Sequence, residues 1–67
     1  MMDVEEVLKF LRDLKSNWHG DFIPQMLFFS KARSEKGWRD SDELSQALKT
    51  LAKRGSIRIG DNWEIYL

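Results

Sequence analysis

The fold is decided by residues 40–67, which read DSDELSQALKTLAKRGSIRIGDNWEIYL. Apolar residues recur in the first half of this stretch at the spacing of one helix face: Leu44, Ala47, Leu48 and Leu51. Gly55 follows them as a typical helix stop. The second half changes to a period of two around Gly60-Asp61-Asn62, a sequence typical of a turn. The stretch therefore predicts a helix over residues 41–54, followed by an antiparallel hairpin with strands at 56–59 and 63–66.

Two further helices are predicted upstream of this stretch. Residues 4–17 carry apolar side chains at helical spacing behind Asp3, which is suited to cap the helix. Pro24 suggests a second helix over residues 24–36, because proline is tolerated in the first turn of a helix. Asp40 or Ser41 is expected to cap the helix over 41–54. Residues 1–67 are thus expected to form a single α+β domain.

Composition limits the class of protein. With 67 residues, of which 42% are hydrophobic, the chain suffices for one domain with a small packed core. It contains no cysteine, which excludes disulfides and cysteine-ligated zinc. Its first residues lack the basic and apolar segments of a signal peptide, and its longest apolar run, residues 26–29, is far too short to span a membrane. We therefore expect a soluble, cytoplasmic protein with no membrane partner.

A short motif closes the third predicted helix. Residues 51–59 read LAKRGSIRI, which matches the pattern L-x-x-x-G-x-[IVL]-x-[IVL]. In this motif, and in the order and lengths of its elements, the chain resembles the winged helix-turn-helix superfamily over nearly its whole length. It is more loosely similar to the C-terminal winged helix of archaeal minichromosome-maintenance helicases. There, too, a helix, a glycine, a second helix and a glycine-led turn precede a helix that ends in L-x-x-x-G-x-I.

The resemblance implies that the helix over 41–54 is the recognition helix of a small DNA-binding protein of the transcription-regulator kind. A helix about 10–12 Å across fits the major groove of B-DNA, which is about 12 Å wide. Gln46 is suited to pair with adenine, and Lys49 with guanine or phosphate. The other residues expected to contact double-stranded DNA are Lys31, Arg33, Lys36, Arg39, Ser41, Ser45, Lys53 and, in the wing, Arg58. A homodimer is expected, because dimerisation doubles the contact area of a single reading helix.

The distribution of charge leaves an alternative open. The 11 basic and 11 acidic residues cancel, and acidic side chains lie both at the start of the recognition helix and in the predicted hairpin. The basic residues between 31 and 39 equally fit a solvated loop without a ligand. The alternative function is therefore a winged helix that binds another protein within a larger complex, with Phe28 and Trp38 at the partner interface.

The sequence gives no indication of catalysis. His19 is the single histidine, and Ser16 and Asp21 are near it only along the chain, which does not define a catalytic triad. Neither a glycine-rich phosphate loop nor a metal-ligand spacing is present. We therefore expect a binding module without cofactor or metal, and not an enzyme.

Overall fold

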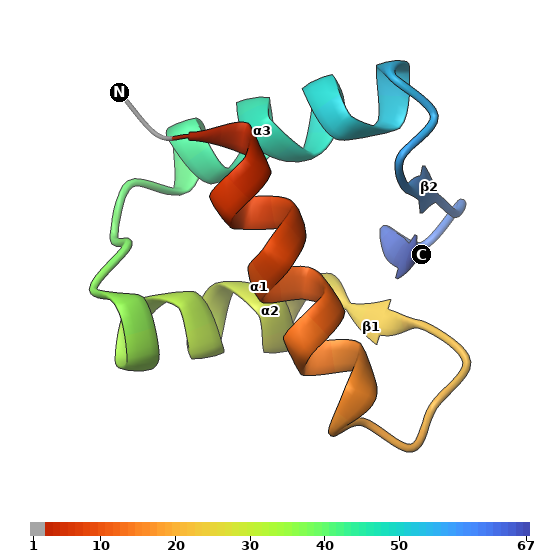
Figure 1. Ribbon diagram of the computed structural model, residues 1–67, viewed down its shortest axis with the longest axis horizontal. Coiled ribbons are helices and arrows are strands. Elements are labelled where there is room, and N and C mark those ends of the chain that lie inside the picture. Colours follow the sequence, from red (N-terminus) through yellow and green to blue (C-terminus); the bar gives the residue numbers. More distant parts are fainter. Residues whose placement is uncertain (1–2) are drawn as a thin grey trace.

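The computed structural model describes residues 3–67, so residues 1 and 2 of the predicted domain lie outside the described part. The chain has an α+β fold, as predicted. Its elements follow in the order α1 (Val4–Ser16), β1 (Ile23–Pro24), α2 (Gln25–Lys31), the π-helical segment η1 (Ala32–Lys36), α3 (Ser41–Lys53), β2 (Arg58–Ile59) and β3 (Glu64–Tyr66) (Figure 1). Within residues 3–67, no helix has the length and apolar character needed to cross a membrane.

Helix α1 lies across the other two helical segments, α2–η1 and α3. Figure 1 shows α1 crossing in front of α2 and α3, and α1 packs directly against α3. The strands gather where α2 begins and α3 ends. One exposed side of α3 is therefore left next to the strands instead of being covered by another helix.

The first helix begins where the sequence predicts and ends one residue earlier. The Asp3 carboxylate accepts a hydrogen bond from the Glu5 N–H at 3.0 Å, which satisfies one of the unpaired donors at a helix start. The helix ends at Ser16, with Asn17 as its cap, and so stops before Gly20. Its buried side is formed by Val7, Leu8, Phe10 and Leu11.

The segment predicted as one helix over 24–36 is divided into three parts. Ile23–Pro24 is extended and forms β1, because the Pro24 ring is suited to a strand at the edge of a sheet and its N–H is not available for a ladder. The α-helix starts at Gln25, and from Ala32 its turns widen into η1. Gly37 ends this segment in a left-handed conformation (φ 69°), which glycine adopts without steric cost.

Both ends of α3 are closed by local hydrogen bonds. The Asp40 carboxylate accepts from the Asp42 and Glu43 N–H groups at 3.0 and 3.2 Å, so Asp40 and not Ser41 is the cap. At the other end Gly55 has a φ of 78°, and the Ser56 N–H donates to the Leu51 carbonyl at 2.9 Å. This 6→1 bond is the Schellman arrangement that terminates many helices at glycine.

The C-terminal hairpin belongs to a three-stranded antiparallel sheet of order β1-β3-β2. In the hairpin Arg58 pairs with Tyr66 and Ile59 with Ile65, as the predicted alternation requires. On its other side Ile65 pairs with Ile23 of β1. The hairpin was predicted, whereas the pairing of β1 with β3 was not.

One apolar core joins the helices to the sheet. Leu11, Ile23, Leu51 and Ile65 are all at most 1% exposed and come from α1, β1, α3 and β3. Phe28 of α2 is fully buried among them, so the prediction that it lies at a partner interface is wrong. Its ring packs 6.0 Å from that of Phe10 and 5.6 Å from that of Phe29, which makes it a core residue.

Candidate functional site

One row of side chains on α3 faces an open groove. Ser41, Ser45 and Lys49 follow one another at intervals of four residues, which places them on the same side of the helix. Together with residues of α2 and of the hairpin they line a groove of about 380 Å³. We call it the α3–hairpin groove. Three residues predicted to contact DNA are thus brought to one surface.

The rest of this groove is apolar or neutral. Its apolar lining comes from three elements: Phe29 of α2, Leu48 of α3 and Ile59 of β2. Gln25, the first residue of α2, adds an amide, and Trp63 adds an indole ring from the tip of the hairpin. Neither Gln25 nor Trp63 was among the predicted site residues. The predicted hairpin has Trp63 as the first residue of its second strand, directly after the Gly60-Asp61-Asn62 turn.

Trp63 has an unusual backbone conformation. Its φ is 63°, and within residues 3–67 it is the one non-glycine residue with a positive φ. Its N–H donates to the Gly60 carbonyl at 3.1 Å, and the Gly60 N–H donates to the Glu64 carbonyl at 2.8 Å. Glycine is the usual residue at a left-handed position that closes such a turn, since any other side chain costs roughly 1–2 kcal/mol there. The residue is nonetheless 57% exposed, so burial in the core does not explain the presence of tryptophan here.

The polar groups of the α3–hairpin groove are not engaged within the fold. Among residues 3–67, the side chains of Gln25, Ser41, Ser45 and Lys49 make neither a hydrogen bond nor an ion pair with another side chain or with the backbone. Of the described residues that line the groove, Lys49 alone is charged. The groove therefore presents one cation and three unbonded polar side chains to a ligand.

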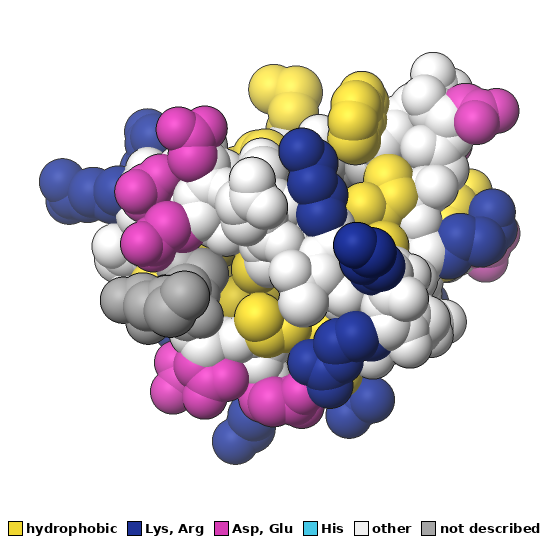
Figure 2. Space-filling view, turned by 90° about the horizontal axis from the view of Figure 1, so that it is seen from above, with side chains coloured by type: hydrophobic (Ala, Val, Ile, Leu, Met, Phe, Trp, Pro, Cys, Tyr) yellow, Lys and Arg dark blue, Asp and Glu magenta, His cyan; other side chains and the backbone are white. Residues whose placement is uncertain are grey.

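The surface view agrees with this distribution. Figure 2 looks down onto the side where α3 lies in Figure 1, and Lys and Arg side chains occupy its centre and right. Hydrophobic side chains project next to them, and Asp and Glu gather on the left, towards the start of α3. The face is thus mixed, with an apolar strip beside its positive part.

The remaining predicted contacts on and near α3 are dispersed. Gln46 and Lys53 are exposed on α3 outside the lining of the groove, and Arg33 and Arg39 are exposed on η1 and on the connection to α3. The Arg58 guanidinium lies 4.1 Å from the centre of the Tyr66 ring, in a cation–π contact across the hairpin.

Lys31 and Lys36 lie elsewhere. They line a second groove of about 500 Å³ between α1 and α2–η1, which we call the α1–α2 groove. The Lys31 ammonium is 3.5 Å from the Glu35 carboxylate, and that of Lys36 lies 5.8 Å from the centre of the Phe10 ring. These two lysines therefore do not extend the surface on which Lys49 lies.

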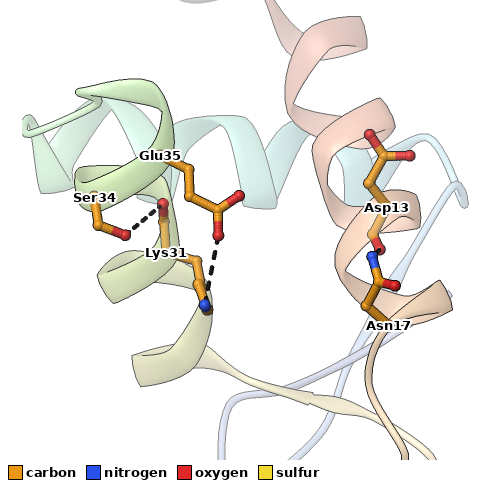
Figure 3. A network of polar contacts seen from close by, with 5 residues as sticks. All are labelled: Asp13, Asn17, Lys31, Ser34 and Glu35. Atoms are coloured by element: carbon orange, nitrogen blue, oxygen red, sulfur yellow. Dashed lines mark hydrogen bonds and ion pairs between the residues drawn. The ribbon is translucent and has the colours of Figure 1, made fainter.

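Polar side chains in the α1–α2 groove bond within their own helices. Figure 3 shows the Asn17 amide bonded to the Asp13 carbonyl on α1, at 3.1 Å. On the facing helix the Ser34 hydroxyl donates to the Lys31 carbonyl at 3.4 Å, beside the Lys31–Glu35 ion pair (Figure 3). This groove carries charges of both signs, and two of them, Lys31 and Glu35, form an ion pair with each other.

Trp38, the second residue predicted at a partner interface, is half-buried. Its ring meets that of Phe10 edge-on at 5.4 Å and packs against the core. Its remaining exposed part lines a shallow pocket with Glu6 and Lys36. Most of its contacts are thus structural.

No group of three or more His, Cys, Asp or Glu side chains suited to hold a metal occurs within residues 3–67. The chain matches no protein-family model, no curated protein and no solved structure. The α3–hairpin groove is consequently the surface on which a functional proposal rests.

Proposed function

We propose that the chain is a winged-helix DNA-binding module of the transcription-regulator kind, which presents α3 to the major groove of duplex DNA. The observation that carries the proposal is the row of Ser41, Ser45 and Lys49 along one exposed side of α3. Serine hydroxyls and a lysine ammonium are donors suited to base edges and phosphates. Because these groups are unbonded within the described fold, contact with DNA breaks no existing interaction of theirs.

The arrangement around α3 supports this function. The helix packs against α1 and is followed directly by the β2–β3 hairpin. In a winged helix, the hairpin corresponds to the wing, which reaches the DNA backbone beside the recognition helix. Gln46 and Lys53 are exposed on the same helix and extend the contact surface.

The charge of this surface predicts weak, salt-sensitive binding. Three exposed cations lie on α3 or just before it: Arg39, Lys49 and Lys53. If each neutralises one phosphate of B-DNA, the logarithm of the association constant falls by about 2.7 for each tenfold rise in salt. The carboxylates of Asp42 and Glu43 oppose the approach of DNA at the start of the helix, which limits nonspecific affinity.

The test is fluorescence anisotropy with a labelled random-sequence duplex, titrated with salt. Lys49→Gln and Lys31→Gln form a matched pair, since each removes one positive charge from a different groove. We expect Lys49→Gln to reduce the salt slope by about 0.9 and Lys31→Gln to leave it unchanged. Absence of binding at about 20 mM salt, or an equal effect of the two substitutions, would contradict the proposal.

A second candidate function is binding of a protein partner, either another copy of the chain or a component of a larger complex. The observation that favours it is the exposure of Met26 and Trp63, which are 84% and 57% accessible. Both side chains line one pocket with Phe22 and Pro24, and contiguous exposed apolar patches mark protein interfaces. Sedimentation of the chain alone tests self-association, which Met26→Asp should abolish if this residue lies at a dimer interface.

A further inference from the structure

The α3–hairpin groove has a shape and a lining that contact with base edges in the DNA major groove does not require. A recognition helix contacts base edges with side chains that stand out from its convex surface. Here the row of Ser41, Ser45 and Lys49 also lines a concave site of about 380 Å³, within the range of sites that hold small ligands. Trp63 forms one wall of this site.

Trp63 contributes little packing to the fold, although its left-handed backbone conformation costs free energy. A left-handed turn position favours glycine or asparagine, and the exposed indole adds little packing to the fold. Non-glycine residues in such strained conformations occur preferentially at functional sites. The ring is thus presented towards solvent at the edge of the groove.

The lining specifies the chemistry of an occupant. An indole face stacks on planar aromatic rings, and the Gln25 amide both donates and accepts hydrogen bonds. Lys49 is a cation at the same site, and no carboxylate occurs among the described residues that line it. A planar group with a hydrogen-bonding edge and an adjoining anion matches this lining, and a nucleotide of a nucleic acid has all three features.

The charges near Trp63 also favour one orientation of a bound nucleotide in the groove. A second pocket, which Trp63 and Gln25 also line, contains Glu64 together with Phe22 and Met26. A phosphate is therefore favoured on the side of Lys49 and disfavoured on the side of Glu64. The base then points from Lys49 towards Trp63 and Gln25.

We propose that the α3–hairpin groove captures one unstacked base of DNA, with Trp63 stacked on the base, Gln25 bonded to its edge and Lys49 at the neighbouring phosphate. The preferred substrate is then DNA with a few unpaired nucleotides next to a duplex, since a base in an intact duplex must first be extruded at a cost in free energy. This inference rests on the proposed DNA-binding function.

The experiment compares a labelled duplex with the same duplex carrying a central three-nucleotide bubble. We expect the wild-type chain to bind the bubble about tenfold more tightly. Trp63→Gly should remove this preference by weakening binding to the bubble more than binding to the intact duplex, and the fold should be retained because glycine suits the turn. Trp63→Phe should keep part of the preference, and Trp18→Gly, which removes another exposed indole, should keep all of it.

Fluorescence gives a second measurement. In a Trp18→Phe, Trp38→Phe variant the remaining emission comes from Trp63, and we expect the bubble to quench it while the intact duplex does not. Circular dichroism checks that each variant is folded. Equal affinity for the two DNAs with dependence on Lys49, or a preference that survives Trp63→Gly, overturns the inference but not the proposed function. Absence of binding to both DNAs overturns both.

Discussion

The two grooves of this small fold differ in what their polar side chains do. In the α1–α2 groove, Asn17 bonds to the backbone carbonyl of Asp13, and Lys31 pairs with Glu35. In the α3–hairpin groove, Ser45 and Lys49 make no such bonds within the described residues. The bonded polar side chains of the α1–α2 groove stabilise the fold, and the unbonded ones of the α3–hairpin groove are available to a partner.

The difference originates in the spacing of charges along the helices. Lys31 has Glu35 four residues later, which is the distance at which helical side chains meet. Lys49 has Ser45 four residues before it and Lys53 four residues after it, so its own helix offers no acid at this spacing. Lys49 is therefore unpaired on its own helix, whereas Lys31 is paired.

The largest expected effect is on the core that supports both grooves. Phe28→Ala should lower the free energy of unfolding by about 3–5 kcal/mol, because it removes a fully buried ring from a chain with a small core. Met26→Ala on the same helix is the control and should change stability by less than about 0.5 kcal/mol, since that side chain is exposed. Thermal melts followed by circular dichroism measure both. A decrease in the free energy of unfolding of less than about 1 kcal/mol for Phe28→Ala would show that the Phe28 ring is not what supports the two grooves.

A smaller effect separates the tryptophans of the two regions. Trp38→Ala should cost about 2 kcal/mol, because its ring packs on Phe10 and against the core. Trp63→Gly should change stability by less than about 1 kcal/mol, since relief of the left-handed strain offsets the lost contacts. Denaturant unfolding of the two variants provides the comparison. If Trp63→Gly proved the more destabilising, Trp63 would have to be regarded as a structural residue.

Charge reversal tests the comparison through binding. Lys49→Glu should weaken binding to duplex DNA more than tenfold, which corresponds to about 1.4 kcal/mol or more, because a phosphate contact becomes a repulsion. Lys31→Glu makes the same change of charge in the α1–α2 groove and should alter the affinity less than twofold. Anisotropy at one fixed salt concentration measures both. Equal losses would indicate that only the net charge of the chain matters.

The smallest expected effect concerns the neutral polar groups. Asn17→Ala should destabilise the fold by about 0.5 kcal/mol, because it removes the bond to the Asp13 carbonyl. Ser45→Ala should be neutral or stabilising by a few tenths of a kcal/mol, since alanine is the better helix former and no bond is lost. Thermal melts of both variants at the same protein concentration measure these changes in stability. A destabilising Ser45→Ala would contradict the view that Ser45 is not engaged in the fold.

The helices are predictable from the sequence because they have periodic patterns and local end signals, and the hairpin is predictable from the Gly60-Asp61-Asn62 turn and the alternation on either side of it. For α3 the predicted range 41–54 compares with Ser41–Lys53, and Asp40 and Gly55 mark its ends. Strand β1 could not be predicted in this way. It has two residues, which cannot show a period, and Pro24 equally fits a helix start. Its conformation depends on β3, about 40 residues later in the chain.

The candidate site was predictable only in part. The outward positions of Ser41, Ser45 and Lys49 follow from the helical period once the buried side of α3 is known. Phe28 was misplaced because α2 is apolar on more than one side, so its composition does not reveal which phenylalanine faces the core. The contribution of Gln25 and Trp63 arises from tertiary packing, which places the start of α2 beside the hairpin.

The position of β3 in the middle of the sheet has a consequence for the order of folding. Residues 64–66 pair with both β1 and β2, so neither neighbour gains its sheet hydrogen bonds until these residues are in place. Until then the helices lack the Ile65 side chain that closes the core at this end. The pairing of β1 with β3 joins parts of the chain that are distant in sequence, the kind of contact that slows folding. Formation of the sheet is therefore expected to be the slow step in the folding of these residues.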